Sequence, residues 1–277
     1  MAAARAVIIG VTGRMGQALV RAAGELSAVR ITAAVASPAS ASLGRDVGAL
    51  ARMEPLGVAV TSDLPAALAA ADVAIDFSQP DATRATIAAC RAARKPLLIG
   101  TTGFEARVTQ PELAAAAGEI PLLIAPNTSL GVAVLTELVR RAARVLPAEF
   151  DIEIIEAHHR TKRDAPSGTA LALARAAAEG RGGVTEGALP DASSGRAGRA
   201  GPRPEGAIGF AVVRGGDIVG EHTVLFAGPG EEVRLSHRAG DRAIFARGAL
   251  RAALWLRGQP PGRYDMGDIV DADHALM

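Results

Sequence analysis

The sequence predicts an α/β protein, a doubly wound parallel sheet followed by a smaller α+β domain. Over residues 1–129, short apolar runs alternate with segments of helical periodicity, a pattern typical of a parallel sheet covered by helices on both faces. After Gly131 the pattern changes to one long helix and then to runs of strands. The 277 residues are enough for two hydrophobic cores.

Composition excludes several classes of protein. Hydrophobic residues make up 49% of the chain and charged residues 21%, which is typical of a globular protein. A net charge of +1 favours neither a nucleic acid nor a membrane partner. Cys90 is the single cysteine, so an intrachain disulfide is impossible and a reducing compartment is favoured. No apolar run is long enough to cross a bilayer, and no signal-peptide pattern precedes the first strand. We therefore expect a cytoplasmic protein.

The first strand leads directly into a glycine-rich turn. Residues 5–10 are predicted to form a buried strand, glycines follow at positions 10, 13 and 16, and residues 17–28 are predicted to form a helix. Glycines let the backbone approach a pyrophosphate, and the helix N-terminus favours its negative charge. The spacing G-x-x-G-x-x-G differs from the usual G-x-G-x-x-G. The turn predicts a dinucleotide site; the alternative is a turn that only packs the helix on the strand.

The second strand, residues 29–36, lacks the acid that such sites often carry at its end. A carboxylate there would bind the adenosine ribose hydroxyls and would repel a 2′-phosphate. Here the strand ends at Ala36 and Ser37, and no arginine follows immediately, although Arg45 is near in sequence. The choice between NADH and NADPH therefore stays open.

Later strand ends in the first half also carry small or polar residues. Strands are predicted over residues 58–61, 73–77, 97–100 and 122–125. The last three end at Ser78, at Thr101-Thr102 and at Asn127-Thr128. In open α/β sheets ligands bind at the carboxyl ends of the strands. The three ends together predict a cofactor cleft, whereas each alone is also explained by turn chemistry.

The second half combines helices and strands differently. Residues 180–206 are rich in Gly, Arg, Pro and Ser and predict an exposed loop. Residues 207–213 and 221–226 are expected to form paired strands. The other predicted elements are helices over residues 132–146, 169–179 and 243–256 and strands over residues 150–157 and 232–238. We expect residues 1–129 and 243–277 to form one domain and residues 130–242 to form the other.

Two adjacent histidines and a lysine mark the stretch over residues 153–171. The chain has 30 basic side chains, but only Lys95 and Lys162 are lysines. Lysine can lose its proton near neutral pH when its pKa is lowered, whereas arginine cannot. His158 and Lys162 are four residues apart, so they can face one site. His158 and His159 are adjacent and lack the spacing of a metal chelate, so no metal is expected.

The same stretch continues into Ser167-Gly168-Thr169, which begins a helix. The free N–H groups and the positive dipole end of a helix suit a substrate carboxylate. Ser167 is also a good N-cap, and capping and anion binding are compatible. Asp164 either orients Lys162 or is only solvated. Glu153 and Glu156 are expected to be structural.

These residues resemble the 4-hydroxy-tetrahydrodipicolinate reductase (dihydrodipicolinate reductase) family. Residues 153–170 fit its signature E-x-x-E-x-H-H-x-x-K-x-D-A-P-S-G-T-A. Further matching elements are the turn at residues 10–16, Gly100-Thr-Thr-Gly103, Ala125-Pro-Asn127 and residues 214–223. The resemblance runs nearly end to end. It departs at Ala36 and Ser37, where the family often has an acid and a base, and at Thr128, where a Phe or Met is usual.

The resemblance implies a fold, an activity and a set of site residues. The fold is a Rossmann-type dinucleotide-binding domain, to which the C-terminal segment returns, plus a substrate-binding and oligomerisation domain that forms a homotetramer. The activity is the NADH- or NADPH-dependent reduction of 4-hydroxy-tetrahydrodipicolinate to tetrahydrodipicolinate in lysine and diaminopimelate biosynthesis. The implied catalytic pair is His158 and Lys162. The implied substrate-binding residues are His159, Ser167, Gly168 and Thr169. The implied cofactor-binding residues are Gly10, Val11, Thr12, Gly13, Arg14, Met15, Gly100, Thr101, Thr102, Ala125, Pro126, Asn127 and Thr128.

Two other functions remain as alternatives. One is a dehydrogenase with the same two-domain plan that acts on a different small acid. The other is a regulator that senses a dinucleotide and has lost the chemistry. The second alternative is disfavoured because both histidines and Lys162 are present.

Overall fold

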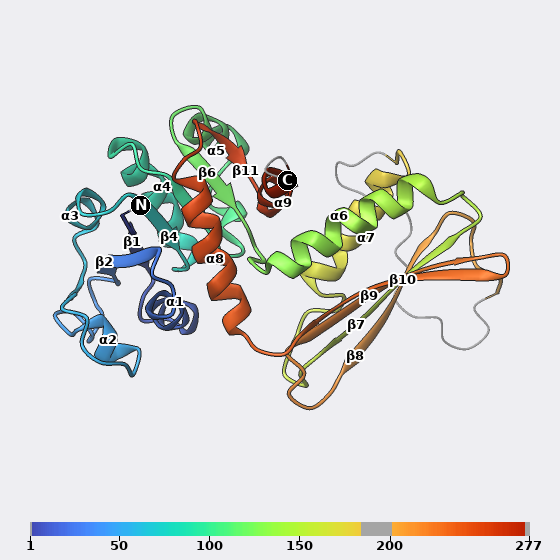
Figure 1. The fold of residues 1–277 in the computed structure, drawn as a ribbon, viewed down its shortest axis with the longest axis horizontal. Coiled ribbons are helices and arrows are strands. Elements are labelled where there is room, and N and C mark those ends of the chain that lie inside the picture. Colours follow the sequence, from blue (N-terminus) through green and yellow to red (C-terminus); the bar gives the residue numbers. More distant parts are fainter. Residues whose placement is uncertain (1, 184–200, 275–277) are drawn as a thin grey trace. The chain divides into compact units, whose positions relative to one another are not determined.

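The computed structural model describes residues 2–183 and 201–274, which divide into two compact units (Figure 1). The first unit comprises Met1–Leu130 and Ala243–Met277, and the second comprises Gly131–Arg242. Of the loop predicted over residues 180–206, residues 184–200 lie outside the described residues.

The first unit is built on a seven-stranded sheet. Its strand order is β11-β6-β5-β4-β1-β2-β3, and every neighbouring pair is parallel. The chain runs outward from β1 in one direction and then from β4 in the other, so the strand order reverses between these two strands. The strands are β1 (Ala4–Ile9), β2 (Val29–Val35), β3 (Val60–Thr61), β4 (Val73–Asp76), β5 (Leu97–Ile99), β6 (Pro121–Ile124) and β11 (Gly262–Tyr264). The predicted doubly wound parallel sheet is confirmed.

Helices cover both faces of this sheet. Alternate strand residues, such as Val7 and Ile9, form one core with α3, α4 and α5. Helices α1 and α8 lie outside this core and contact each other. Local signals set several helix starts: Asp63 caps α3, and Thr109 and Glu112 form a capping box at α5. The helices are α1 (Arg14–Gly24), α2 (Val47–Leu50), α3 (Leu64–Ala69), α4 (Pro80–Ala92), α5 (Gln110–Ala117), α8 (Ala243–Leu256) and α9 (Met266–His274), with a 3₁₀ turn η1 (Phe104–Ala106).

Sequence patterns missed some elements of the first unit and misplaced a boundary. Four short elements were not predicted: α2, η1, β11 and α9. Helix α1 ends at Gly24, four residues before the predicted end at Ala28. Glycine disfavours helix continuation, and Val29 must already begin β2.

Helix α8, the first element after the second unit, packs closely on the loop after β6. Thr128 Oγ1 donates a 2.7 Å hydrogen bond to the carbonyl of Phe245. A Cβ at Gly248 would lie 1.8 Å from the carbonyl oxygen of Thr128, so only glycine permits this approach. The helix therefore belongs to the first unit although it follows the whole second unit in sequence.

The second unit is a four-stranded sheet with two helices on one face (Figure 1). Its order is β10-β9-β7-β8, with β7 and β8 parallel and the other pairs antiparallel. The predicted direct pairing of residues 207–213 with 221–226 is wrong, because β7 lies between these strands. The apolar β7 pairs on both edges, and the connection from β8 to β9 passes its end. The elements are α6 (Leu130–Val145), β7 (Asp151–His158), α7 (Gly168–Gly180), β8 (Ile208–Arg214), β9 (Gly220–Gly228) and β10 (Glu231–Ala239).

The two faces of this second sheet differ. Along β7, buried residues alternate with partly exposed ones, and the buried set packs with α6 and α7. The opposite face carries apolar side chains that no element of this unit covers fully. Val213 on it is 49% exposed, and its neighbours there are Ile155, Ala157, Ala211 and Leu225. We call these five residues the open sheet face.

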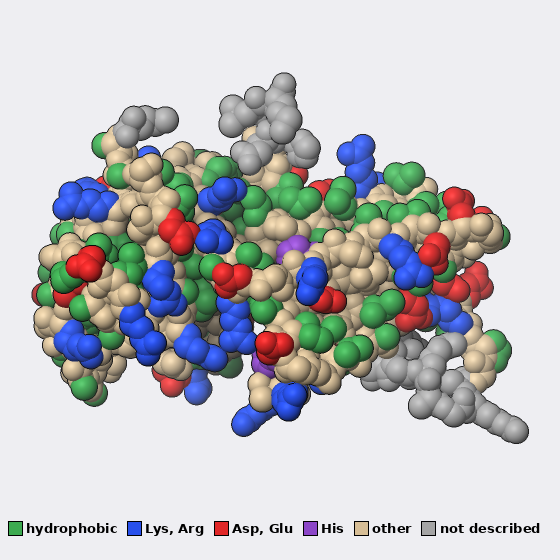
Figure 2. Space-filling view, turned by 60° about the horizontal axis from the view of Figure 1, so that its bottom comes forward, with side chains coloured by type: hydrophobic (Ala, Val, Ile, Leu, Met, Phe, Trp, Pro, Cys, Tyr) green, Lys and Arg blue, Asp and Glu red, His purple; other side chains and the backbone are tan. Residues whose placement is uncertain are grey.

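Acidic, basic and hydrophobic side chains are intermixed on the surface drawn in Figure 2. This agrees with a net charge of +1 and gives no broad field of one sign on that face. Among the described residues, no helix has the length and apolar character needed to cross a membrane.

Candidate active site

The predicted site residues fall on both units, and each set is described within its own unit. The first set lies at the carboxyl ends of β1, β5 and β6 in the first unit. The second set lies at the end of β7 and the start of α7 in the second unit.

The turn after β1 is tightly packed and its helix is left uncapped. Gly10 has φ +82°, and a Cβ there would lie 2.5 Å from the carbonyl oxygen of Phe77. A Cβ at Gly16 would lie 2.4 Å from the carbonyl oxygen of Gly10. Gly13 is the N-cap of α1, and no described side chain caps this helix. Packing therefore explains Gly10 and Gly16, whereas Gly13 leaves the first N–H groups of α1 without a side-chain acceptor.

This turn fits a pyrophosphate. Thr12, Gly13 and Arg14 are exposed, Met15 is partly exposed, and Val11 is buried beneath them. Helices α3, α5 and α7 each have a side-chain cap, from Asp63, Thr109 or Ser167, whereas α1 and α4 have none. An anion at α1 would meet unpaired N–H groups, the positive dipole end and Arg14.

The loops after β4 and β5 are joined through Asp76. Its Oδ1 accepts hydrogen bonds from the N–H of Ser78 at 2.8 Å and from Thr101 Oγ1 at 3.3 Å. Gly100 packs against Phe77, where a Cβ would lie 2.1 Å from the ring. Burial raises the pKa of the Asp76 carboxyl, against the lowering effect of these hydrogen bonds. Thr101 is buried and Thr102 is exposed.

The loop after β6 completes this edge of the sheet. The N–H of Ala125 bonds to the carbonyl of Ile99 at 2.9 Å, so this loop begins beside the end of β5. Pro126 is exposed and Asn127 partly exposed, and Asn127 Oδ1 accepts the N–H of Ser129 at 2.9 Å. The Thr128 side chain is buried and bonded to α8, so a ligand here could meet only its backbone.

Asp46 does not take the place of the missing acid at the end of β2. Ala36 is buried and Ser37 is exposed. The next acid, Asp46, accepts five backbone N–H bonds with its two oxygens, from residues 48, 49, 56, 57 and 58. These bonds, led by that of Leu56, hold the pKa of Asp46 below its usual value. Both carboxylate oxygens of Asp46 are thus already hydrogen-bonded to the backbone of its own loop.

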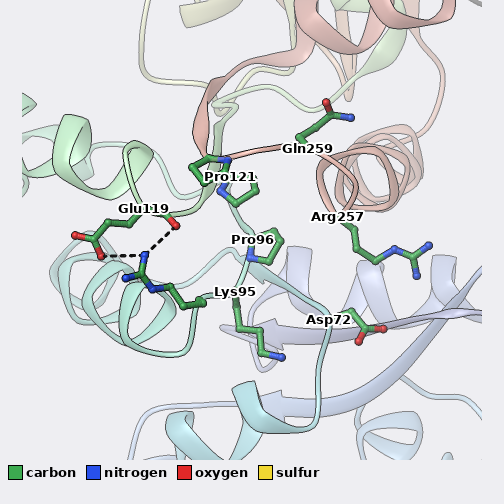
Figure 3. A pocket seen from close by; sticks show the side chains of 9 residues that line it. Asp72, Lys95, Pro96, Glu119, Pro121, Arg257 and Gln259 are labelled. Atoms are coloured by element: carbon green, nitrogen blue, oxygen red, sulfur yellow. Dashed lines mark hydrogen bonds and ion pairs between the residues drawn. The ribbon is translucent and has the colours of Figure 1, made fainter.

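A pocket elsewhere on the first unit lies at the opposite edge of the sheet. Its volume is about 600 Å³, and Asp72, Lys95, Pro96 and Pro121 are among its lining residues (Figure 3). These residues precede or begin β4, β5 and β6, so they stand at the amino ends of the strands. The residues predicted to bind a cofactor stand at the carboxyl ends, and the pocket contains none of them.

In the second unit, Glu156 is the centre of the site. It is 1% exposed and accepts four hydrogen bonds. Arg214 donates to both oxygens at 2.8 Å, the N–H of Ser167 donates at 3.0 Å, and Nδ1 of His158 lies 2.5 Å from Oε2. Burial favours a higher pKa for Glu156, but the bonds from Arg214, His158 and Ser167 outweigh it and lower the pKa. Glu156 is therefore ionised.

This arrangement determines which nitrogen of His158 is available. An ionised carboxylate can only accept, so Nδ1 carries a proton and Nε2 is the nitrogen left for chemistry. Burial lowers the pKa of His158, and nearby Lys162 and Arg214 add to this, although Glu156 acts in the opposite direction. A Cβ at Gly220 would lie 3.1 Å from Nε2, so the glycine keeps the space beside this nitrogen open.

Lys162 lies in the turn that follows β7. Its N–H bonds to the carbonyl of His159, and its Nζ is 2.8 Å from Asp164 Oδ2. This ion pair lowers the pKa of Asp164 and favours the first of the two alternatives, in which Asp164 orients the lysine. His159 is partly exposed, and its Nδ1 lies 2.8 Å from Thr161 Oγ1.

The start of α7 combines a buried cap with an exposed backbone. Ser167 Oγ accepts the N–H of Ala170 at 3.1 Å and lies 3.1 Å from Nε2 of His222. Ser167 is 1% exposed, so its structural role as an N-cap is evident. Gly168 is exposed with open space where a Cβ would stand, and Thr169 is partly exposed.

Three residues of this cluster were missed or underrated from the sequence: Glu156, Arg214 and His222. His222 is 4% exposed and packs edge to face on His158 with ring centroids 5.1 Å apart. Burial, and then His158, lower the pKa of His222 to about 4. The strand periodicity carried a usable signal, because Glu156 and His158 share the face of Ile152 and Ile154.

Within residues 2–183 and 201–274, no group of three or more His, Cys, Asp or Glu side chains is arranged to hold a metal ion.

Comparison with known proteins identifies the family. Residues 4–128 match the family model "Dihydrodipicolinate reductase, N-terminus", and residues 131–270 match "Dihydrodipicolinate reductase, C-terminus". A 4-hydroxy-tetrahydrodipicolinate reductase from Alkalilimnicola ehrlichii is 52% identical over 96% of this chain and 98% of its own. One from Anaeromyxobacter dehalogenans is 49% identical over 96% of this chain and 97% of its own.

Comparison with solved structures supports the same family. A dipicolinate-bound dihydrodipicolinate reductase from Paenisporosarcina sp. TG-14 matches with a TM-score of 0.76 and 26% identity, covering 96% of this chain and 99% of that one. An amine dehydrogenase from Mycobacterium smegmatis, with a TM-score of 0.61, 17% identity and coverage of 95% of each chain, shares the fold. The chain belongs to the dihydrodipicolinate reductase family and is an oxidoreductase.

Proposed function

We propose that the protein reduces 4-hydroxy-tetrahydrodipicolinate to tetrahydrodipicolinate with NADH or NADPH, in the cytoplasmic synthesis of lysine and diaminopimelate. The observation that carries this proposal is the cluster around Glu156, which fixes His158 and the start of α7 and lies near Lys162. Such a cluster suits a small substrate with carboxylates and a proton to be transferred. It argues against a regulator that only senses a dinucleotide.

In the first unit, the proposed cofactor contacts are those of the uncapped α1 turn and of the loops after β5 and β6. Residues 10–15 would bind the pyrophosphate, and residues 100–102 and 125–128 would bind toward the nicotinamide. The reduced nicotinamide supplies the hydride when it is bound. In the second unit, the exposed backbone of Gly168, together with Thr169 and His159, would hold a substrate carboxylate at the positive end of α7. Ser167, the fourth residue of the predicted set, is buried with its N–H bonded to Glu156 and its hydroxyl capping the helix, so it would act by shaping this turn.

The proton chemistry falls to His158 and Lys162. The 4-hydroxyl group must first leave as water, which gives a conjugated ring imine. Hydride addition to its conjugated carbon then moves electrons toward the ring nitrogen, and the resulting enamine must take up a proton. Lys162 would donate the proton, and Nε2 of His158 is the nitrogen available to accept or return one. Glu156 would contribute by bonding to Nδ1 of His158 and by stabilising the charged imidazolium form of this ring.

The proposed homotetramer is supported by the open sheet face. Five apolar side chains lie together there, and Val213 among them is about half exposed. Exposed apolar patches on sheets are typical of association surfaces. We propose that copies of the chain pack through this face.

The reaction is tested by following the absorbance of the reduced nicotinamide with freshly synthesised substrate. We expect oxidation that depends on the substrate and is inhibited by 2,6-pyridinedicarboxylate. If neither NADH nor NADPH is oxidised, the protein is not this reductase. Oxidation with a different small acid alone would favour the alternative dehydrogenase.

Replacement of Lys162 tests the proton donor. Lys162→Ala should lower kcat by roughly 10²-fold or more, the range for a lost general acid. Lys162→Arg keeps the charge but cannot release a proton, so it should be similarly impaired. Lys95→Ala, the same change at the only other lysine, serves as the control. An unchanged kcat in Lys162→Ala would remove this residue from the mechanism.

Replacement of Glu156 tests how His158 is held. Glu156 favours the charged imidazole, so Glu156→Gln should lower the pKa of His158, and the ring should titrate at a lower pH than in wild type. NMR titration of the histidine ring signals measures this directly. Glu153→Gln, on the opposite face of β7, should leave the titration unchanged. A higher titration midpoint in Glu156→Gln would contradict the proposed role.

Paired kinetics with NADH and NADPH test the cofactor site. The chain has neither an acid at Ala36 nor an available carboxylate at Asp46, so discrimination should be modest. We expect kcat/KM values for the two cofactors to lie within about 100-fold, or about 2.7 kcal/mol. A stronger preference would show that other residues select the cofactor.

A charge on the open sheet face tests the proposed assembly. Val213→Asp should convert the tetramer to smaller species, because a carboxylate would have to be buried without a partner. Val145→Asp places the same charge at a side chain that is 74% exposed on α6 and should leave the assembly intact. Light scattering after gel filtration measures both masses, and a tetramer of unchanged stability in Val213→Asp would exclude this face.

A further inference from the structure

Asp76 occupies the central position at the carboxyl edge of the first sheet. It is the last residue of β4, and it pairs with Ile9 of β1 on one side and Ile99 of β5 on the other. The glycine turn follows β1, and Gly100 follows β5. Its side chain is fully buried. The proton chemistry proposed above makes no use of it.

The contacts of Asp76 join two loops. Its main-chain oxygen accepts the N–H of Gly100 at 2.9 Å, and its Oδ1 accepts the Thr101 hydroxyl at 3.3 Å. The same Oδ1 accepts the N–H of Ser78 at 2.8 Å. The loop after β5 is therefore held by the side chain and the backbone of one residue, which also shapes the loop after β4.

The surroundings of Asp76 are unsuited to a charge. Among the described residues, no Lys, Arg or His forms an ion pair with it, and Oδ2 is buried without a hydrogen-bond partner. Burial of a carboxylate without a counter-charge costs several kcal/mol of folding free energy. Burial of a neutral acid costs less, because only one polar atom then has incomplete hydrogen bonding. Burial also raises the pKa of Asp76, in agreement with a neutral side chain.

We propose that Asp76 is a positioning residue, which as an uncharged hydrogen-bonding group holds Gly100 and Thr101 in the shape that receives the nicotinamide half of the cofactor. This inference rests on the proposed use of NADH or NADPH. It adds a residue that the sequence motifs did not single out. Asp76 itself acts through Thr101 and the backbone and needs no contact with the cofactor.

The experiment compares three variants. Asp76→Asn keeps the shape and the hydrogen-bonding oxygen of a neutral acid, whereas Asp76→Ala removes the link to Thr101 and Ser78. Asp72→Asn is the matched control, because Asp72 directly precedes the same strand at its other end. It is bonded there to Arg5 and lines the pocket of Figure 3. Binding of NADH and of NADPH is measured by titration without substrate.

A positioning role predicts distinct results for the three variants. Asp76→Asn should bind NADH within about 3-fold of wild type, and Asp76→Ala should bind at least 10-fold more weakly, or about 1.4 kcal/mol. In kinetics, Asp76→Ala should raise KM for the cofactor more than it lowers kcat. Asp72→Asn should bind normally although it loses stability. If Asp76→Asn and Asp76→Ala are both folded and bind NADH equally weakly, a charge is needed at this position and the proposal is overturned. Normal NADH binding by Asp76→Ala would also overturn it.

A second pair of variants applies if Asp76→Ala does not fold. Thr101→Val removes the hydroxyl that bonds to Asp76, and Thr101→Ser retains it. The proposal requires weaker NADH binding in the first and near-normal binding in the second, and equal binding in both overturns it. A wild type that binds NADH but reduces no substrate would overturn the proposed function alone. A wild type that binds neither cofactor would overturn both.

Discussion

The second unit depends on one buried ion pair, between Glu156 and Arg214. A carboxylate that is 1% exposed must be neutralised, and Arg214 does this with two hydrogen bonds from the neighbouring strand. The remaining capacity of the carboxylate is taken by His158 and by the N–H of Ser167. One charge thus sets the imidazole orientation and the place where α7 begins. Removing either partner would leave a buried charge uncompensated.

Each unit contains a buried carboxyl side chain, and the surroundings of the two carboxyl groups differ. Glu156 is paired, ionised and surrounded by donors, so it can orient an imidazole and favour its protonation. Asp76 has no ion-pair partner among the described residues, and in its proposed role it is a neutral acid that links two loops. The difference follows from position: β8 brings Arg214 beside Glu156, whereas β4 is flanked by apolar strands whose ends offer only hydroxyl and N–H groups.

Much of the fold was predictable because its signals are local. Alternating apolar strands and helices predict a doubly wound sheet, and caps such as Asp63 mark helix starts. Strand pairing is not local. Residues 207–213 and 221–226 look like a hairpin, but β7, which comes much earlier in the chain, lies between them and pairs with both. Short elements such as β11 have too few residues to show a period.

The candidate site shows the same division between local and non-local information. His158 and Lys162 are predictable as site residues because they are close in sequence and because histidine and lysine are rare in this chain. The sequence alone predicts only a structural role for Glu156, and its partners are not visible there because they come from β8 and from the start of α7, 58 and 11 residues away. The carboxylate that accepts the bonds from Arg214 and Ser167 in the core also holds His158. The packing of the second unit and the proposed proton transfer therefore depend on the same side chain.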